Sequence, residues 1–226
     1  MELVREVLLE PLIQSPSLPL YYQRLGTLLA EEQRRRQQFY ETVAEDQKAE
    51  FINGEVIVHS PVKLEHEFAS NNLNKLLGAY VTLHDLGYAG HEKMLITFTR
   101  NDYEPDVCFW RQEKAAQFAA AQMRFPVPDF IAEVLSPSTA AIDRGVKLDD
   151  YAAHGVQEYW IVDPARQNIE QYVLETTGYI LRQKTNSGLL RSVAVPGFEI
   201  PATAVFDRQS HLAALRALLQ TEAPPT

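Results

Sequence analysis

The chain has 226 residues, of which 46% are hydrophobic and 23% charged, and its formal net charge is −9. This length can bury one sizeable core, so we expect a folded protein with one main domain and extensions. The negative charge excludes a general electrostatic attraction to nucleic acid but not a local basic groove. No apolar run is long enough to span a membrane, and the first residues carry acids where a signal peptide carries basic residues. We therefore expect a cytoplasmic protein with no membrane partner.

Two segments of different composition open the chain. Three prolines before residue 20 predict an irregular arm over residues 1–25, and the proline-free run at 24–48 predicts a helix. Arg34, Arg35 and Arg36 fall on different sides of that helix, which favours a solvated face over a phosphate-binding patch. Asn-Gly within residues 51–58 then predicts a β-hairpin.

The next elements bring an imidazole and an acid to defined positions. Residues 63–81 repeat apolar side chains at helical spacing, with His66 near the start, where a histidine is more often a core or cap residue than a ligand. Residues 91–100 predict a strand, and 103–110 a second one. Glu104-Pro105-Asp106 opens that second strand, because proline is tolerated where no ladder donor is needed. Asp106 is therefore predicted to lie at the start of this strand.

A single cysteine, Cys108, lies in the same strand beside two aromatic residues. One cysteine excludes an intrachain disulfide and a multi-cysteine zinc site. Its apolar neighbours favour a buried small hydrophobe over a reactive thiol.

The central stretch predicts a buried strand at 130–135, a helix at 141–154 and a second strand at 158–163. Such a βαβ-like unit is normally covered on both faces, so its strands are near-continuous apolar runs. Glu133 breaks that pattern, and an ionised carboxylate in an apolar run is costly unless a partner compensates it. Beyond it we expect a hairpin over 168–184, a further strand at 189–195 and a last helix at 207–220.

On the central helix, Asp143, Lys147 and Tyr151 are spaced four residues apart and share one face. A structural interpretation exists for each acid and base: Asp106 as a turn residue, Glu133 paired with Arg144, and Lys147 paired with Asp143 on a solvated face.

The chemical interpretation joins two acids and one base. Mg²⁺ is typically held by one or two carboxylates plus waters and substrate phosphate, which Asp106 and Glu133 could supply from neighbouring strands. Lys147 could stabilise the charge that develops at a phosphodiester or orient the attacking water. Two acids and a lysine suit phosphodiester cleavage.

The central stretch resembles the Uma-two family of restriction-type endonucleases, which belongs to the PD-(D/E)XK nuclease superfamily. The residues that carry the resemblance are the run from Asp129 through Glu133 to Ser138, then Asp143, Lys147, Tyr151 and residues 155–164. Glu104 to Asp106 and the opening at residues 51–55 also match. The resemblance covers roughly residues 40 to 185.

The resemblance implies an α/β, restriction-endonuclease-like mixed sheet flanked by helices, Mg²⁺ or Mn²⁺ dependence and a DNA substrate. It makes Asp106 and Glu133 the metal ligands and Lys147 the catalytic lysine, displaced onto the helix because Leu135 stands where the simplest pattern has lysine. His66 and Tyr151 are accessory candidates. We expect an arm and helix over 1–49, a nuclease-like core over 50–205 and a terminal helix and tail over 206–226.

Two other functions remain open. A nuclease-like fold that no longer cuts, acting as an interaction or regulatory module, fits the net charge. A glycosidase that uses paired carboxylates is a third alternative, but the separation of the two carboxylates, on which that mechanism depends, cannot be read from the sequence. Cutting two strands usually needs two sites, so we expect a homodimer, paired through the arginine-rich or the C-terminal helix.

Overall fold

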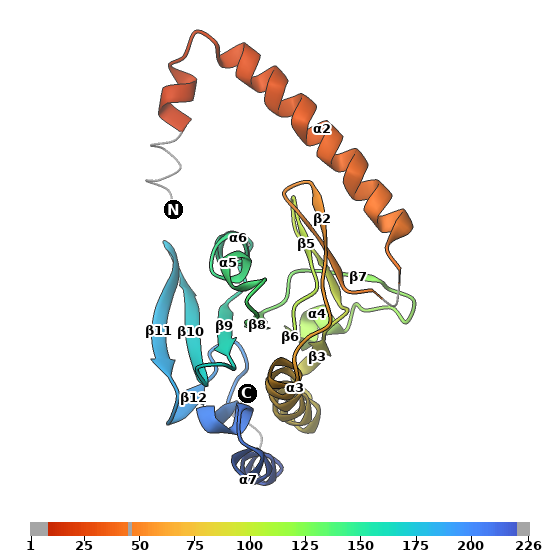
Figure 1. Cartoon of the computed structure of the whole chain (residues 1–226). Helices are drawn as coiled ribbons and strands as arrows, with labels where there is room; N and C mark the ends of the chain where they lie inside the picture. The colour runs from red at the N-terminus through yellow and green to blue at the C-terminus, as the bar shows by residue number, and fades with distance from the viewer. Residues whose placement is uncertain (1–8, 45–46, 221–226) are drawn as a thin grey trace. The chain divides into compact units, whose positions relative to one another are not determined.

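The computed structural model describes residues 9–44 and 47–220; the start of the predicted arm and the end of the predicted tail lie outside the described residues. The chain forms two compact units, Met1–His59 with Thr99–Tyr103, and Ser60–Phe98 with Glu104–Thr226 (Figure 1). Within the described ranges, no helix is both long and apolar enough to cross a membrane.

The described part of the first unit contains a short helical segment at residues 9–13, the long helix α2 (Leu18–Thr42) and three short strands, β1 (Ala49–Ile52), β2 (Glu55–Val58) and β5 (Asp102–Tyr103). β1 pairs antiparallel with both β2 and β5. The predicted hairpin is confirmed, since Asn53 and Gly54 at its turn have φ of 50° and 85°. Positive φ at both central residues is what a type I′ turn requires.

Helix α2 starts earlier than the sequence predicted. It begins at Leu18 and ends at Thr42. The prediction that an irregular arm extends to residue 25 and the prediction that the helix continues to residue 48 were therefore both wrong. Pro19 lies in the first turn, where the missing N–H has no partner to lose, so this proline is compatible with the helix.

The arginines of α2 do not all face solvent. Arg34 and Arg35 are exposed as predicted, but Arg36 is buried. Its Nε lies 2.6 Å from Oδ2 of Asp102 and its Nη2 lies 2.8 Å from Oδ1, a two-pronged ion pair that joins α2 to β5. Arg36 is a structural residue of the first unit.

The second unit is built on a six-stranded mixed sheet in the order β11-β10-β9-β8-β6-β3. Only β8 and β9 pair in parallel, and the other neighbours are antiparallel. The strands are β3 (Gly87–His91), β6 (Val107–Arg111), β8 (Phe130–Val134), β9 (Glu158–Asp163), β10 (Asn168–Glu175) and β11 (Gly178–Thr185). The predicted α/β class with a mixed sheet is confirmed.

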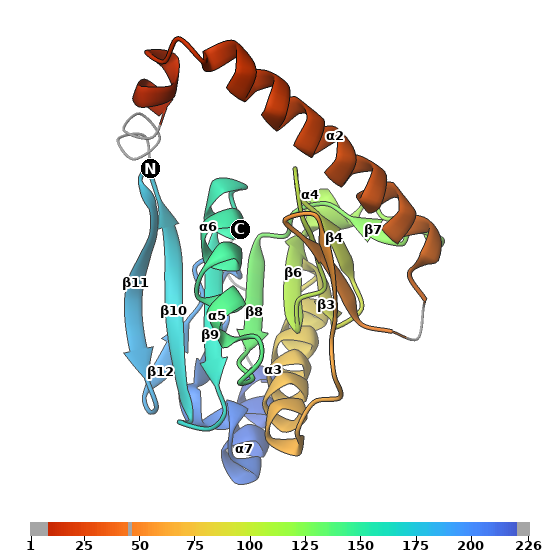
Figure 2. The same cartoon turned by 45° about the horizontal axis from the view of Figure 1, so that its top comes forward.

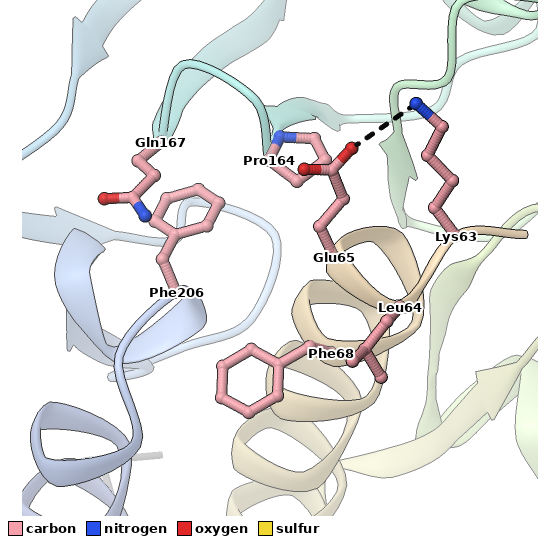
Figure 3. Close-up of a pocket in the computed structure, with 7 residues that line it drawn as sticks. All are labelled: Lys63, Leu64, Glu65, Phe68, Pro164, Gln167 and Phe206. Atoms are coloured by element: carbon pink, nitrogen blue, oxygen red, sulfur yellow. Dashed lines mark ion pairs between the residues drawn. The ribbon is translucent and has the colours of Figure 1, made fainter.

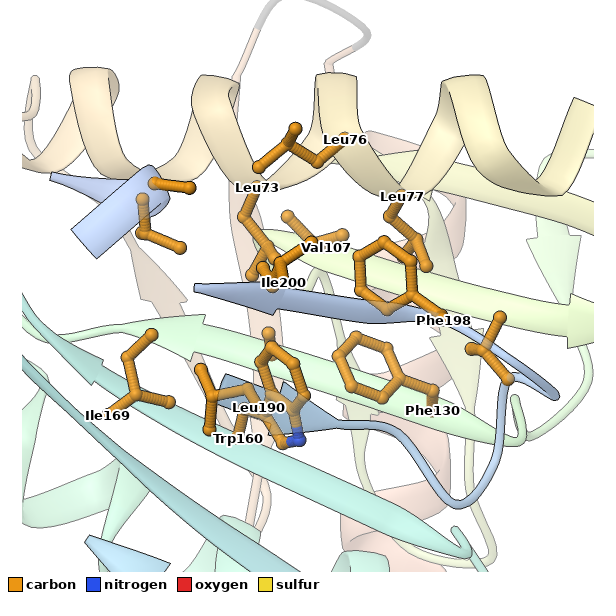
Figure 4. Packing of buried hydrophobic residues seen from close by; sticks show 14 of the residues in the cluster. Leu73, Leu76, Leu77, Val107, Phe130, Trp160, Ile169, Leu190, Phe198 and Ile200 are labelled. Carbon is orange, nitrogen blue, oxygen red and sulfur yellow. The ribbon is translucent and has the colours of Figure 1, made fainter. Parts of the chain in front are cut away.

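Helices cover both faces of this sheet (Figure 2). α3 (Leu64–Leu83) and α7 (Arg208–Leu218) lie on one side, and α5 (Ala140–Asp143) and α6 (Val146–Ala153) on the other. The main core lies under α3, where Leu73 and Leu77 meet Phe130, Trp160 and other buried side chains (Figure 4). Short elements complete the unit: β4 (Leu95–Thr97), α4 (Gln112–Ala115), β7 (Arg124–Phe125), β12 (Leu189–Arg191), β13 (Glu199–Pro201) and η1 (Ala202–Val205).

Two predicted elements are each broken in two. The helix predicted over 141–154 is interrupted at Gly145, whose φ of −116° and ψ of −103° are not helical, which agrees with the low helix propensity of glycine. The strand predicted over 91–100 is divided between β3 and β4, because Glu92 and Lys93 adopt positive φ. The last helix starts as expected, with Asp207 accepting a hydrogen bond from the amide of Ser210 at 2.7 Å.

Candidate active site

Asp106 lies directly before β6, buried, at the strand's mouth as predicted. Its Oδ2 accepts a hydrogen bond from the amide of Val134 at 2.7 Å and lies 3.3 Å from Nε2 of His66, in the first turn of α3. Val107 is opposite Ala132 in the β6–β8 pairing, so Asp106 and Glu133 occupy the next opposed positions. The two predicted acids are therefore neighbours.

Glu133 points away from the main core. Ala132 and Val134 belong to the core under α3, so the alternation of the strand turns Glu133 to the face that carries α6. There its Oε1 accepts hydrogen bonds from Lys147 Nζ at 2.9 Å and from the Tyr151 hydroxyl at 2.8 Å. These bonds compensate the buried carboxylate.

Lys147 is buried rather than on a solvated helix face, with 2% of its side chain exposed. The ion pair with Asp143 does form, at 3.4 Å between Nζ and Oδ1, but it lies inside the protein beside Glu133. A buried ammonium between two carboxylates interacts with them far more strongly than an exposed one would. The structural interpretation of Lys147 as a surface residue is wrong.

Negative charge is concentrated around these side chains. Burial, followed by the charge of Asp143 and then that of Glu133, raises the pKa of Tyr159 well above its usual value. Burial, followed by the charge of Glu133, also raises the pKa of Cys108 well above the usual range, so the predicted buried and unreactive thiol agrees with its position.

The donor set suits a hard divalent ion. Within residues 9–44 and 47–220, no three His, Cys, Asp or Glu side chains are grouped closely enough to form an all-protein metal cage. Mg²⁺ does not need one, since it is usually held by one or two carboxylates and completes its shell with water and substrate phosphate. Asp106, the residue before β6, and Glu133, in β8 one residue beyond the Val107–Ala132 pair, are two carboxylates of the kind that this requires.

A separate pocket of about 600 Å³ opens where α3 begins (Figure 3). Its lining comes from the start of α3, the turn after β9 and the residue after η1: Lys63, Leu64, Glu65, Phe68, Pro164, Gln167 and Phe206. Glu65 is the sequence neighbour of His66, yet none of the five predicted site residues lines this pocket.

A family model described as "Uma2: Putative restriction endonuclease" matches residues 36–203, well over half of the chain. The chain belongs to the Uma2 family. Two relatives from Synechocystis sp., "Uncharacterized protein sll1609" and "Uncharacterized protein slr1290", are each 30% identical over 131 residues, or 56% of this chain. The matched region covers 72% of the first relative and 66% of the second.

A solved structure shares the fold of this Uma2 protein. The crystal structure of "a putative nuclease" from Anabaena variabilis superposes with a TM-score of 0.59 at 16% identity, covering 74% of this chain and 90% of that one. At this identity the likeness shows the fold alone. The description of the family supports a nuclease.

Sequence reasoning missed another buried acid on this face of the Uma2 sheet, Glu170. Glu170 of β10 accepts hydrogen bonds from Arg144 Nη1 and from the Tyr172 hydroxyl, and lies 2.8 Å from Lys184 Nζ. Arg144 was considered as a partner of Glu133, and it pairs with Glu170 instead. The sequence did contain a signal for Glu170, an acidic residue within a predicted strand. The same signal pointed to Glu133.

Proposed function

We propose that this Uma2 protein is a divalent-metal-dependent endonuclease that hydrolyses DNA phosphodiester bonds. The observation that carries the proposal is the buried meeting of Asp106, Glu133 and Lys147 on one face of the sheet, where β6 begins and β8 ends. Family membership supports the reaction class. A buried acid pair with an adjacent ammonium is expensive to maintain for structure alone, which favours a chemical role.

Each side chain has a role that follows from its contacts. Asp106 and Glu133 would hold Mg²⁺ or Mn²⁺, which when bound supplies an activated water and positive charge at the phosphate. Lys147 presents its ammonium beside Glu133, where it can stabilise charge that develops on the phosphate oxygens. Tyr151 fixes the Glu133 carboxylate by its hydrogen bond, and His66 orients Asp106.

The test combines cleavage with metal binding. Glu133→Gln should abolish Mn²⁺-supported cleavage of a plasmid, while Arg216→Gln, on the exposed side of α7, should cut like the parent. Mn²⁺ should raise the melting temperature of the parent, because a ligand at 100 times its Kd adds about 2.7 kcal/mol to the stability. Asp106→Asn should lose most of that rise.

Three outcomes separate the alternatives. Cleavage by Glu133→Gln at the parent's rate would assign the activity to another site or to a contaminant. A parent that neither binds Mn²⁺ nor cuts would favour the interaction or regulatory module. Cleavage that chelators leave unchanged would contradict a metal-dependent mechanism.

A further inference from the structure

One row of side chains crosses the sheet from the candidate active site. Glu133 is paired with Ile161, Ile161 with Glu170, and Glu170 with Lys184, in β8, β9, β10 and β11. Paired residues of adjacent strands project to the same face, so Glu170 and Lys184 lie on the face that carries Glu133. At a strand spacing of about 4.8 Å, the backbone of Glu170 is roughly 10 Å from that of Glu133, and that of Lys184 roughly 14 Å.

Glu170 holds two cations at this position. Its side chain is 4% exposed, whereas the side chains of Arg144 and Lys184 are 35% and 51% exposed. Burial acts to raise the pKa of Glu170, but hydrogen bonds from Arg144, Lys184 and Tyr172 outweigh it and lower the pKa to about 2. The acid is therefore ionised at any physiological pH, and it fixes two partly open cations in place.

Arg144 connects this group to Lys147. It lies three residues before Lys147, at the break between α5 and α6, and it reaches Glu170 while Lys147 reaches Glu133. Three cations thus follow one another across the face, from the ammonium beside the acid pair to the edge strand β11. The Arg144, Lys184 and Glu170 group carries one positive charge in excess, on a chain whose formal charge is −9.

We propose that Arg144 and Lys184 bind a backbone phosphate of the nucleic acid next to the one that is cut, with Glu170 as the residue that positions both cations. The proposal rests on the proposed nuclease function and adds a substrate contact to it. A guanidinium fork together with an ammonium is well suited to phosphate oxygens. Contacts of this kind carry no base specificity; they fix the register of the strand over the site.

The experiment measures binding without cleavage. In EDTA, the anisotropy of a fluorescein-labelled DNA duplex gives the affinity of the full chain over a range of KCl concentrations. Each phosphate contact adds about 0.9 to the slope of log K against log salt concentration. Arg144→Gln with Lys184→Gln removes one phosphate contact and should therefore reduce the slope by about 0.9 and weaken binding at low salt.

A matched control removes the same charge from the other face. Lys75→Gln with Arg216→Gln changes exposed residues of α3 and α7, which cover the opposite side of the sheet, and should leave the slope unchanged. If the Arg144 and Lys184 double variant does not fold, Lys184→Gln alone leaves Arg144 on Glu170 and should reduce the slope by up to about 0.9.

The results distinguish the two proposals. If these variants leave the slope unchanged, or if the slope falls equally in the control, the proposed phosphate contact is wrong. The proposed nuclease function still holds in that case, provided that the parent cuts the duplex in Mn²⁺. A parent that neither binds nor cuts DNA overturns both.

Discussion

Lys147 and Glu133 form an ion pair inside the protein, with Nζ 2.9 Å from Oε1 and 2% and 4% of the two side chains exposed. Removing one partner leaves a buried charge without compensation, which typically costs about 3–5 kcal/mol. We expect Lys147→Met to lower the free energy of unfolding, measured by urea denaturation, by about 3–5 kcal/mol. Lys75→Met, on an exposed part of α3, should change it by less than about 0.5 kcal/mol.

The same pair can be tested by a double-mutant cycle. Glu133→Gln removes the charge that Lys147 compensates, so Lys147→Met with Glu133→Gln should cost less than the sum of the two single changes. Strict additivity would contradict an energetic coupling between these side chains.

Glu170 predicts a specific dependence of stability on pH. Its pKa in the folded protein is about 2, below the usual 4.5, so its contribution is present above pH 4.5 and is lost as the pH falls towards 2. Glu170→Gln should therefore be less stable than the parent at pH 7, and the difference in the free energy of unfolding should shrink between pH 4.5 and 2. A difference that stays constant over this interval would mean that the carboxylate charge is not what stabilises the protein.

The first half of α2 exposes an apolar stripe that repeats every seven residues. Its members are Leu18, Tyr21, Tyr22, Leu25, Leu28 and Leu29. Heptad spacing is typical of helices that pair with one another, so we expect the predicted homodimer to form here, between two copies of α2. Leu25→Asp should halve the mass measured by light scattering, whereas Gln38→Asp, off the stripe, should not. A parent that is monomeric at high concentration would contradict this prediction.

Local patterns in the sequence predicted the fold class and most of its elements. Asn53-Gly54 specified its turn because few residue pairs tolerate positive φ twice, and β9 lies where its apolar run predicted it. The breaks at Gly145 and at Glu92 were missed. Nothing in a periodic pattern tells whether an interrupting residue will bend the chain or continue the element.

The geometry of the candidate site depends on long-range pairing, which the sequence does not contain. Glu133 was recognisable because an acid inside an apolar strand needs a partner, but its partner was Lys147 rather than Arg144. The burial of Lys147 follows from how α6 lies on the sheet. Spacing along a helix gives a shared face and does not show what that face meets.

Because the amide of Val134 fixes Asp106, the acid pair is tied to the strand register of β6 against β8. A slip of a single residue would turn Asp106 to the other side of the sheet and separate it from Glu133. A chain with this shifted register would keep its helices and strands, but its two acids would lie on opposite faces of the sheet. If the two acids bind a metal ion as proposed, the affinity for that ion would report on the register of the sheet, because only the correct register brings both carboxylates to the same face.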